Sequence, residues 1–190
     1  PQIGPVVITE IMYHPAAVAD AEYVELLNIS DTPVTLYDET LNAPWRFTDD
    51  PDDPGIELLF PTDPPITLAP GAYLVLVRDA LAFDAAYNVS DSLPILAWGA
   101  GKLANGREKI QLSKPAGALD DEHDDRPWIR IDRVVYSDGR HPDDFASGID
   151  PWPAAADGQG AALERVNARV YGNDPANWRA AAPSPGWIAP

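Results

Sequence analysis

The chain has 190 residues, of which 45% are hydrophobic, and it combines a formal net charge of −17 with no cysteine. The lack of cysteine excludes disulfide frameworks, thiolate nucleophiles and sulfur-ligated metals. The negative charge repels nucleic acid and anionic lipid, and no apolar run approaches the ~20 residues that cross a bilayer. Neither nucleic-acid binding nor membrane insertion is therefore expected.

The acidic side chains outweigh the basic ones mainly in the first half of the chain. Residues 1–101 contain 16 acidic side chains against only Arg46 and Arg78, whereas residues 102–190 contain 14 against 11 basic ones. We interpret this excess as a solubility surface, with cation binding by acidic loops as the alternative. The chain begins at Pro1 without an initiating methionine, as expected of a segment taken from a larger exported protein.

Short runs of β-branched and aromatic residues, separated by turn residues, predict an all-β chain. Turn signals recur about every ten residues, which is typical of a two-sheet sandwich. We expect a single domain over residues 1–190, with about seven to nine strands and an irregular tail from Asn173 to Pro190. The predicted strands cover residues 6–13, 23–28, 34–36, 45–48, 56–60, 72–78, 109–113, 128–136 and 163–166.

The side-chain pattern also predicts which residues face the core. In residues 23–28, Val24 and Leu26 are expected to point inward and Glu25 to face water. Residues 72–78 are apolar on both faces, which indicates a central strand. Ile110 and Leu112 alternate with polar residues and are also expected in the core.

One short helix is predicted from Ala80 to Tyr87. Asp79 precedes it and is a suitable N-cap, because its carboxylate accepts a hydrogen bond from a free backbone N–H of the first turn. Leu81, Phe83 and Tyr87 are expected to form its apolar side.

An ordered set of segments resembles the lamin-tail domain family. The set consists of residues 7–15, 22–31, 68–75, 103–112, 131–136, 151–153, 157–160, 174–179 and 183–186. The resemblance implies an immunoglobulin-like β-sandwich that serves as a binding or scaffolding module, and bacterial relatives of this kind occur in large exported proteins. The chain is longer than the compact family pattern between Trp45 and Leu68, and again between Val135 and Trp152.

Two acidic runs have the oxygen-ligand density that Ca²⁺ prefers. Neither has the spacing of an EF-hand, and a solvated loop avoids charge repulsion simply by staying extended. No cofactor is required by the sequence, and calcium is the one candidate ion. The candidate ligands are Asp49, Asp50, Asp52 and Asp53 in the first run, and Asp120, Asp121, Asp124 and Asp125 in the second.

Other candidate sites have weaker support from the sequence. His14, His123 and His141 are far apart and are expected to be loop residues rather than zinc ligands. Glu10 and Glu25 are a conceivable carboxylate pair for hydrolysis, but the chain has no nucleophile elbow, metalloprotease helix motif or phosphate-binding glycine loop. No enzyme is therefore expected.

Six tryptophans raise the possibility of a sugar-stacking platform. Trp45 and Trp178 lie within apolar or family-like segments and are expected in the core. Trp128, Trp152 and Trp187 lie near prolines and are the candidates for exposure.

The sequence therefore favours a noncatalytic interaction, scaffolding or adhesion module of a secreted or cell-surface bacterial protein. Its partners would be a protein or another extracellular ligand, together with the neighbouring domains of the parent chain. Two alternatives are a calcium-stabilised adhesion module and a carbohydrate-binding accessory module of an exported hydrolase.

Overall fold

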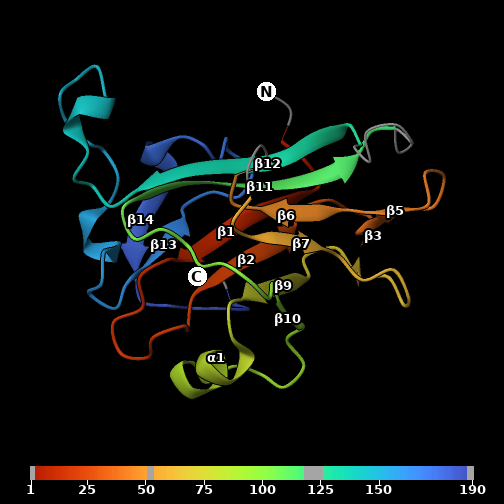
Figure 1. Ribbon diagram of the computed structural model, residues 1–190. Coiled ribbons are helices and arrows are strands. Elements are labelled where there is room, and N and C mark those ends of the chain that lie inside the picture. Colours follow the sequence, from red (N-terminus) through yellow and green to blue (C-terminus); the bar gives the residue numbers. More distant parts are fainter. Residues whose placement is uncertain (1–2, 51–53, 118–125, 188–190) are drawn as a thin grey trace.

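Two β-sheets form the body of the molecule. The computed structural model in Figure 1 describes residues 3–50, 54–117 and 126–187. The six-stranded sheet has the order β10 (Ile95–Ala97), β9 (Tyr73–Val77), β2 (Tyr23–Asn28), β1 (Val6–Met12), β13 (Ala162–Arg165) and β14 (Trp178–Ala181). The four-stranded sheet has the order β12 (Trp128–Ser137), β11 (Arg107–Pro115), β6 (Arg46–Thr48) and β7 (Glu57–Leu59).

The remaining elements are short. Two ribbons pair β3 (Val34–Thr35) with β8 (Thr67–Leu68) and β4 (Tyr37–Asp38) with β5 (Ala43–Pro44). The single α-helix is α1 (Ala80–Ala86), and 3-10 turns cover Pro142–Asp144, Ala154–Ala156 and Pro175–Asn177. The all-β prediction is confirmed, although the described residues form fourteen strands because two-residue strands escape sequence patterns.

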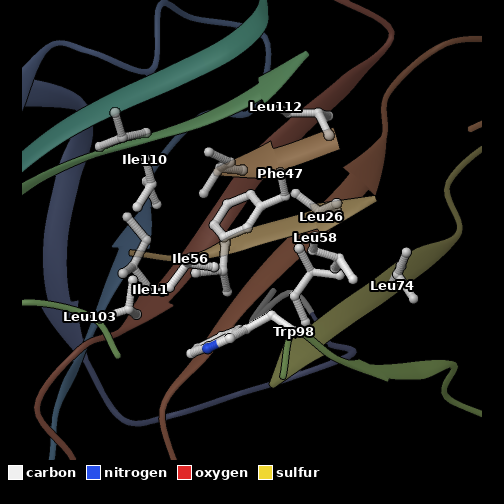
Figure 2. Close-up of a cluster of buried hydrophobic side chains, with 14 of the residues drawn as sticks. Ile11, Leu26, Phe47, Ile56, Leu58, Leu74, Trp98, Leu103, Ile110 and Leu112 are labelled. Atoms are coloured by element: carbon white, nitrogen blue, oxygen red, sulfur yellow. The ribbon is translucent and has the colours of Figure 1, made fainter. Parts of the chain in front are cut away.

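Apolar side chains from both sheets form the main core. Val24 and Leu26 of β2 face Ile110 and Leu112 of β11, and all four are fully buried, as predicted from their alternation. Figure 2 shows the Phe47 ring in the middle of this cluster. Burying one such side chain contributes about 1.5–3 kcal/mol, so the core is the main source of stability.

The two sheets are also joined by a buried ion pair. Nη1 of Arg165 lies 2.7 Å from Oδ2 of Asp132, and the same carboxylate oxygen accepts the Ile8 backbone N–H at 2.9 Å. Arg165 also donates to the backbone oxygens of Ile8 at 2.8 Å and Val170 at 2.7 Å. These bonds connect β12 of the four-stranded sheet with β1 and β13 of the six-stranded sheet. Among the described residues the two sheets are not joined by strand pairing at this point, so side chains make the connection.

Helix α1 covers part of the outer face of the six-stranded sheet. Asp79 caps it as predicted, because its Oδ1 accepts the Ala82 N–H at 2.8 Å. Phe83 and Tyr87 pack edge-on against Tyr23 of β2 and build a second, smaller apolar cluster. The prediction for Leu81 is wrong, since this side chain is 81% exposed. A seven-residue helix turns only one narrow face toward the sheet.

The residues after Asn173 are more regular than predicted. Trp178–Ala181 forms β14, which pairs antiparallel with β13. This strand contains no β-branched residue, so its local propensity is low and only pairing with β13 defines it. Trp178 is buried as predicted and donates its indole N–H to the Gly172 oxygen at 2.6 Å.

The tryptophans divide differently from the prediction. Trp45 is buried as expected, and Trp187 is 60% exposed as expected. Trp152 is buried, not exposed, because its ring packs against Trp178 with centroids 6.1 Å apart. Trp128 is half-buried. No helix in the part of the chain that the structure describes is long and apolar enough to cross a membrane.

Candidate interaction site

Two carboxylates are buried on the outer face of the six-stranded sheet. Glu10 of β1 and Glu25 of β2 stand directly opposite each other in the register and are 1% and 2% exposed. The prediction that Glu25 faces water is therefore wrong. Glu25 does point away from Val24 and Leu26, as strand alternation requires, but a later segment of the chain covers this face.

The cover is residues 183–187, which we call the C-terminal strap. Oε1 of Glu10 accepts the Ser184 backbone N–H at 2.9 Å, and Oε2 of Glu25 accepts the Gly186 backbone N–H at 2.6 Å. Thr9 Oγ1 donates to Oε1 of Glu25 at 2.6 Å. The two carboxylates thus hold the strap by its backbone.

Burial raises the pKa of both carboxyl groups. The pKa of Glu10 rises to about 8, mainly through desolvation; the Ser184 N–H opposes the rise and the nearby Glu25 adds to it. The pKa of Glu25 rises to about 7 through desolvation, against the lowering effects of Thr9 and Gly186. Such values suit a general acid, but both groups are shielded from solvent and bound to backbone amides. Their role in this arrangement is to position the strap.

The strap forms one wall of a groove with a volume of about 490 Å³. The other walls are the 15–18 loop and the residues that follow α1. The lining is mainly apolar and aromatic and includes Met12, Tyr87, Val89, Pro183, Pro185 and Trp187. No charged residue lines the groove, although the chain carries a net charge of −17. The groove therefore suits an uncharged, largely apolar ligand.

Two aromatic side chains of the groove are held in different ways. The Tyr87 ring packs on Tyr23 with centroids 5.1 Å apart, and its hydroxyl donates to the Ala21 oxygen at 3.2 Å. Trp187 is exposed, but its backbone N–H donates to the Ser184 oxygen at 3.0 Å. Gly186 allows this turn, because its φ is 81° and a Cβ there would lie 2.8 Å from Leu93.

The predicted calcium ligands fall mostly outside the described residues. Asp52, Asp53, Asp120, Asp121, Asp124 and Asp125 lie there. Asp49 is buried and accepts the Asp50 backbone N–H at 2.6 Å, and Asp50 lies 3.1 Å from Lys109. Within residues 3–50, 54–117 and 126–187, no group of three or more acidic or histidine side chains is arranged to hold a metal ion.

The histidines do not meet in the described structure. Nδ1 of His14 lies 2.6 Å from Asp157, and Nε2 of His141 lies 3.5 Å from Asp138. His123 lies outside the described residues. His14 and His141 both lie outside the helices and strands, as predicted, and they pair with different carboxylates.

The geometry defines a class of protein: a two-sheet β-sandwich with an apolar groove at its outer face. Residues 1–130 match the family model described as the Lamin Tail Domain, and the chain belongs to this family. The predicted immunoglobulin-like fold is confirmed. The domains of this family are noncatalytic, and membership implies a module of the protein-interaction type. No curated protein matches the chain significantly.

The family match bears on how the site is assembled. Glu10, Glu25 and Tyr87 lie within the matched residues, whereas β13, β14 and the C-terminal strap lie beyond residue 130. Sequence reasoning missed the groove because the strap comes from far along the chain. The available signal was the pair of carboxylates in two strongly apolar strands.

Proposed function

We propose that this chain is a noncatalytic protein-interaction module of a secreted or cell-surface bacterial protein. In this proposal the groove beside the C-terminal strap holds an uncharged, proline-containing segment of a partner protein. Membership of the lamin tail domain family supports the general role. The observation that carries the specific role is the exposed Trp187 beside Tyr87 in a groove without charged side chains.

The chemistry of the lining argues for this occupant. Extended proline-rich segments dock on grooves lined by aromatic rings, because their preformed helix loses little entropy on binding. Tryptophan and tyrosine are also the side chains that most often dominate interface energy. A charged segment would leave its charge without a partner in this groove and is disfavoured.

Selection from a displayed library of short peptides tests the proposal. We expect the selected peptides to be rich in proline and apolar residues and poor in charge. Trp187→Ala should weaken them by about tenfold or more, which is ordinary for an aromatic anchor. Leu81→Ala is the control, since Leu81 is exposed on α1 and does not line the groove. Peptides that bind Trp187→Ala equally well would overturn this role for the groove.

A carbohydrate-binding role is the second candidate, because Asn88 and Ser184 add polar groups beside the exposed Trp187 ring. Quenching of tryptophan fluorescence by soluble polysaccharides, lost in Trp187→Ala, would support it over the peptide.

A calcium-stabilised adhesion module is the further alternative. A calcium-dependent rise in Tm that Asp50→Asn abolishes would support that role.

A further inference from the structure

The outer face of the four-stranded sheet differs from the rest of this acidic molecule. Phe47 of β6 and Leu112 of β11 are paired in register and point into the core. Strand alternation therefore turns their neighbours outward: Arg46 and Thr48 on β6, Gln111 and Ser113 on β11.

The register adds two arginines from β12 to this surface. Arg133 stands opposite Gln111, which stands opposite Thr48; Arg130 stands opposite Ser113, which stands opposite Arg46. Directly opposed residues share one side of a sheet. The resulting arginine face consists of Arg46, Thr48, Gln111, Ser113, Arg130 and Arg133. Thr48, Gln111 and Ser113 are themselves buried, so the accessible part of the face is the exposed Arg130 and the half-buried Arg46 and Arg133.

The arginines of this face differ in how they are paired. The Arg46 guanidinium lies 4.2 Å from the centroid of the Trp128 ring, and Nη1 lies 3.5 Å from Glu57. Among the described residues, no side chain forms a hydrogen bond or an ion pair with the side chain of Arg130 or Arg133. This is unexpected in a chain with 30 acidic and 13 basic residues.

Buried polar atoms without a partner also gather here. Nε of Arg46, Nε of Arg133 and Oγ1 of Thr48 are buried and have no hydrogen-bond partner in the described part of the chain. Native proteins contain few such atoms, because a buried donor or acceptor without a partner is destabilising. Arg130, Arg133 and Tyr171 line a pocket of about 200 Å³ at the β12 edge, together with Asp132, whose carboxylate is paired with Arg165. The face thus concentrates hydrogen-bond donors without acceptors among residues 3–50, 54–117 and 126–187.

We propose that the arginine face binds an acidic segment of a partner protein, a short stretch rich in aspartate and glutamate. Carboxylates match the forked donors of arginine and supply acceptors that no described residue offers to Arg130 or Arg133. The exposed Leu59, which stands opposite Arg46, offers apolar contact at the rim. This surface is separate from the groove and shares with the proposed function only the premise that the module binds protein.

Long-range electrostatics give this interaction a recognisable salt dependence. The net charge of −17 repels an acidic segment at low ionic strength, where the Debye length is about 30 Å at about 0.01 M. At about 0.15 M it is about 8 Å, so the distant acids are screened while contact pairs persist. Affinity is therefore expected to rise from low to intermediate salt and to fall again at high salt.

The test measures fluorescence polarisation of a labelled glutamate-rich peptide, with the matching glutamine peptide as reference, at about 0.15 M salt. Arg130→Gln with Arg133→Gln should weaken binding by about tenfold or more. The control pair is Lys102→Gln with Arg169→Gln, which makes the same change in net charge at exposed positions outside the face. It should change the affinity by less than about twofold.

Four outcomes would overturn the inference. The first is an equal loss of peptide affinity in both double variants, and the second is equal affinity for the glutamate and glutamine peptides. The third is arginine-dependent binding of a sulfated oligosaccharide that is tighter than binding of the glutamate peptide. The fourth is a dimer of this chain that dissociates in the Arg130→Gln, Arg133→Gln variant. Trp187→Ala should leave the affinity for the glutamate peptide unchanged. The failure of this inference is thereby distinguishable from the failure of the groove proposal.

Discussion

The outer faces of the two sheets carry charged residues that differ in burial and in hydrogen bonding. Glu10 and Glu25 on the six-stranded sheet are covered by the strap, have raised pKa values and accept backbone N–H groups. On the four-stranded sheet Arg130 is exposed and Arg133 is half-buried, and neither side chain has a hydrogen-bond or ion-pair partner among the described residues. Strand alternation puts all four outside the main core. What packs on each face afterwards decides whether a charge serves the fold or remains for a ligand.

The largest loss of stability is expected from breaking the Asp132–Arg165 ion pair, which joins the two sheets. Asp132→Ala leaves Arg165 buried without its carboxylate and is expected to cost about 3–5 kcal/mol of unfolding free energy. Denaturant unfolding followed by tryptophan fluorescence measures it. Replacing both partners together, with Asp132→Leu and Arg165→Met, should cost less than Asp132→Ala alone. A loss below about 0.5 kcal/mol in Asp132→Ala would contradict the role of this pair.

The covered face predicts a particular pH dependence. Because folding raises the pKa of Glu10 and Glu25, the folded state holds protons that the unfolded state has released between about pH 4.5 and pH 8. Unfolding free energy should therefore fall as pH rises through this window, by about 2 kcal/mol or more. The double variant Glu10→Gln, Glu25→Gln should lose much of this dependence of stability on pH. Part of the dependence should remain, because the pKa of Glu108 is also raised, to about 7. A stability that rises from pH 5 to 8 would contradict the burial.

Gly186→Ala tests how the strap is held. Its φ of 81° and the Leu93 side chain, which lies 2.8 Å from where a Cβ would stand, both oppose a side chain at this position, so the loss should exceed the ~1–2 kcal/mol of backbone strain alone. Gly148→Ala is the matched control, because Gly148 has a φ of 67° and open space around it. Thermal melts compare the two. Equal losses would show that the contact at Leu93 is unimportant.

The smallest effect on stability is expected from Arg130 and Arg133 of the arginine face. Arg130→Gln with Arg133→Gln should change unfolding free energy by less than about 0.5 kcal/mol, because neither side chain has a partner to lose among the described residues. Denaturant unfolding at neutral pH measures it. A loss of more than about 1.5 kcal/mol would mean that these arginines support the fold instead.

Most of the strand framework was predictable from local patterns. Alternation identified Val24, Leu26, Ile110 and Leu112 as core residues. The capping preference of aspartate identified Asp79 as the helix N-cap. Each prediction depends on only a few neighbouring positions. Strand β14 was not predictable, since its alanine-rich sequence becomes a strand only beside β13.

The candidate sites depend on contacts between distant segments. The burial of Glu25 is determined by Gly186, which lies 161 residues later in the chain. The arginine face requires the register of β12, β11 and β6, which no local pattern specifies. Side-chain alternation gives the direction of a residue, but only the complete fold shows what covers it.

The most direct test of two separate binding surfaces is one crossed experiment. It measures the affinities of a selected proline-rich peptide and of the glutamate-rich peptide for the wild type, Trp187→Ala and the Arg130→Gln, Arg133→Gln variant. The account predicts that Trp187→Ala loses only the proline-rich peptide and that the arginine variant loses only the glutamate-rich one. Loss of both peptides in a single variant, or of neither peptide in both, would contradict it.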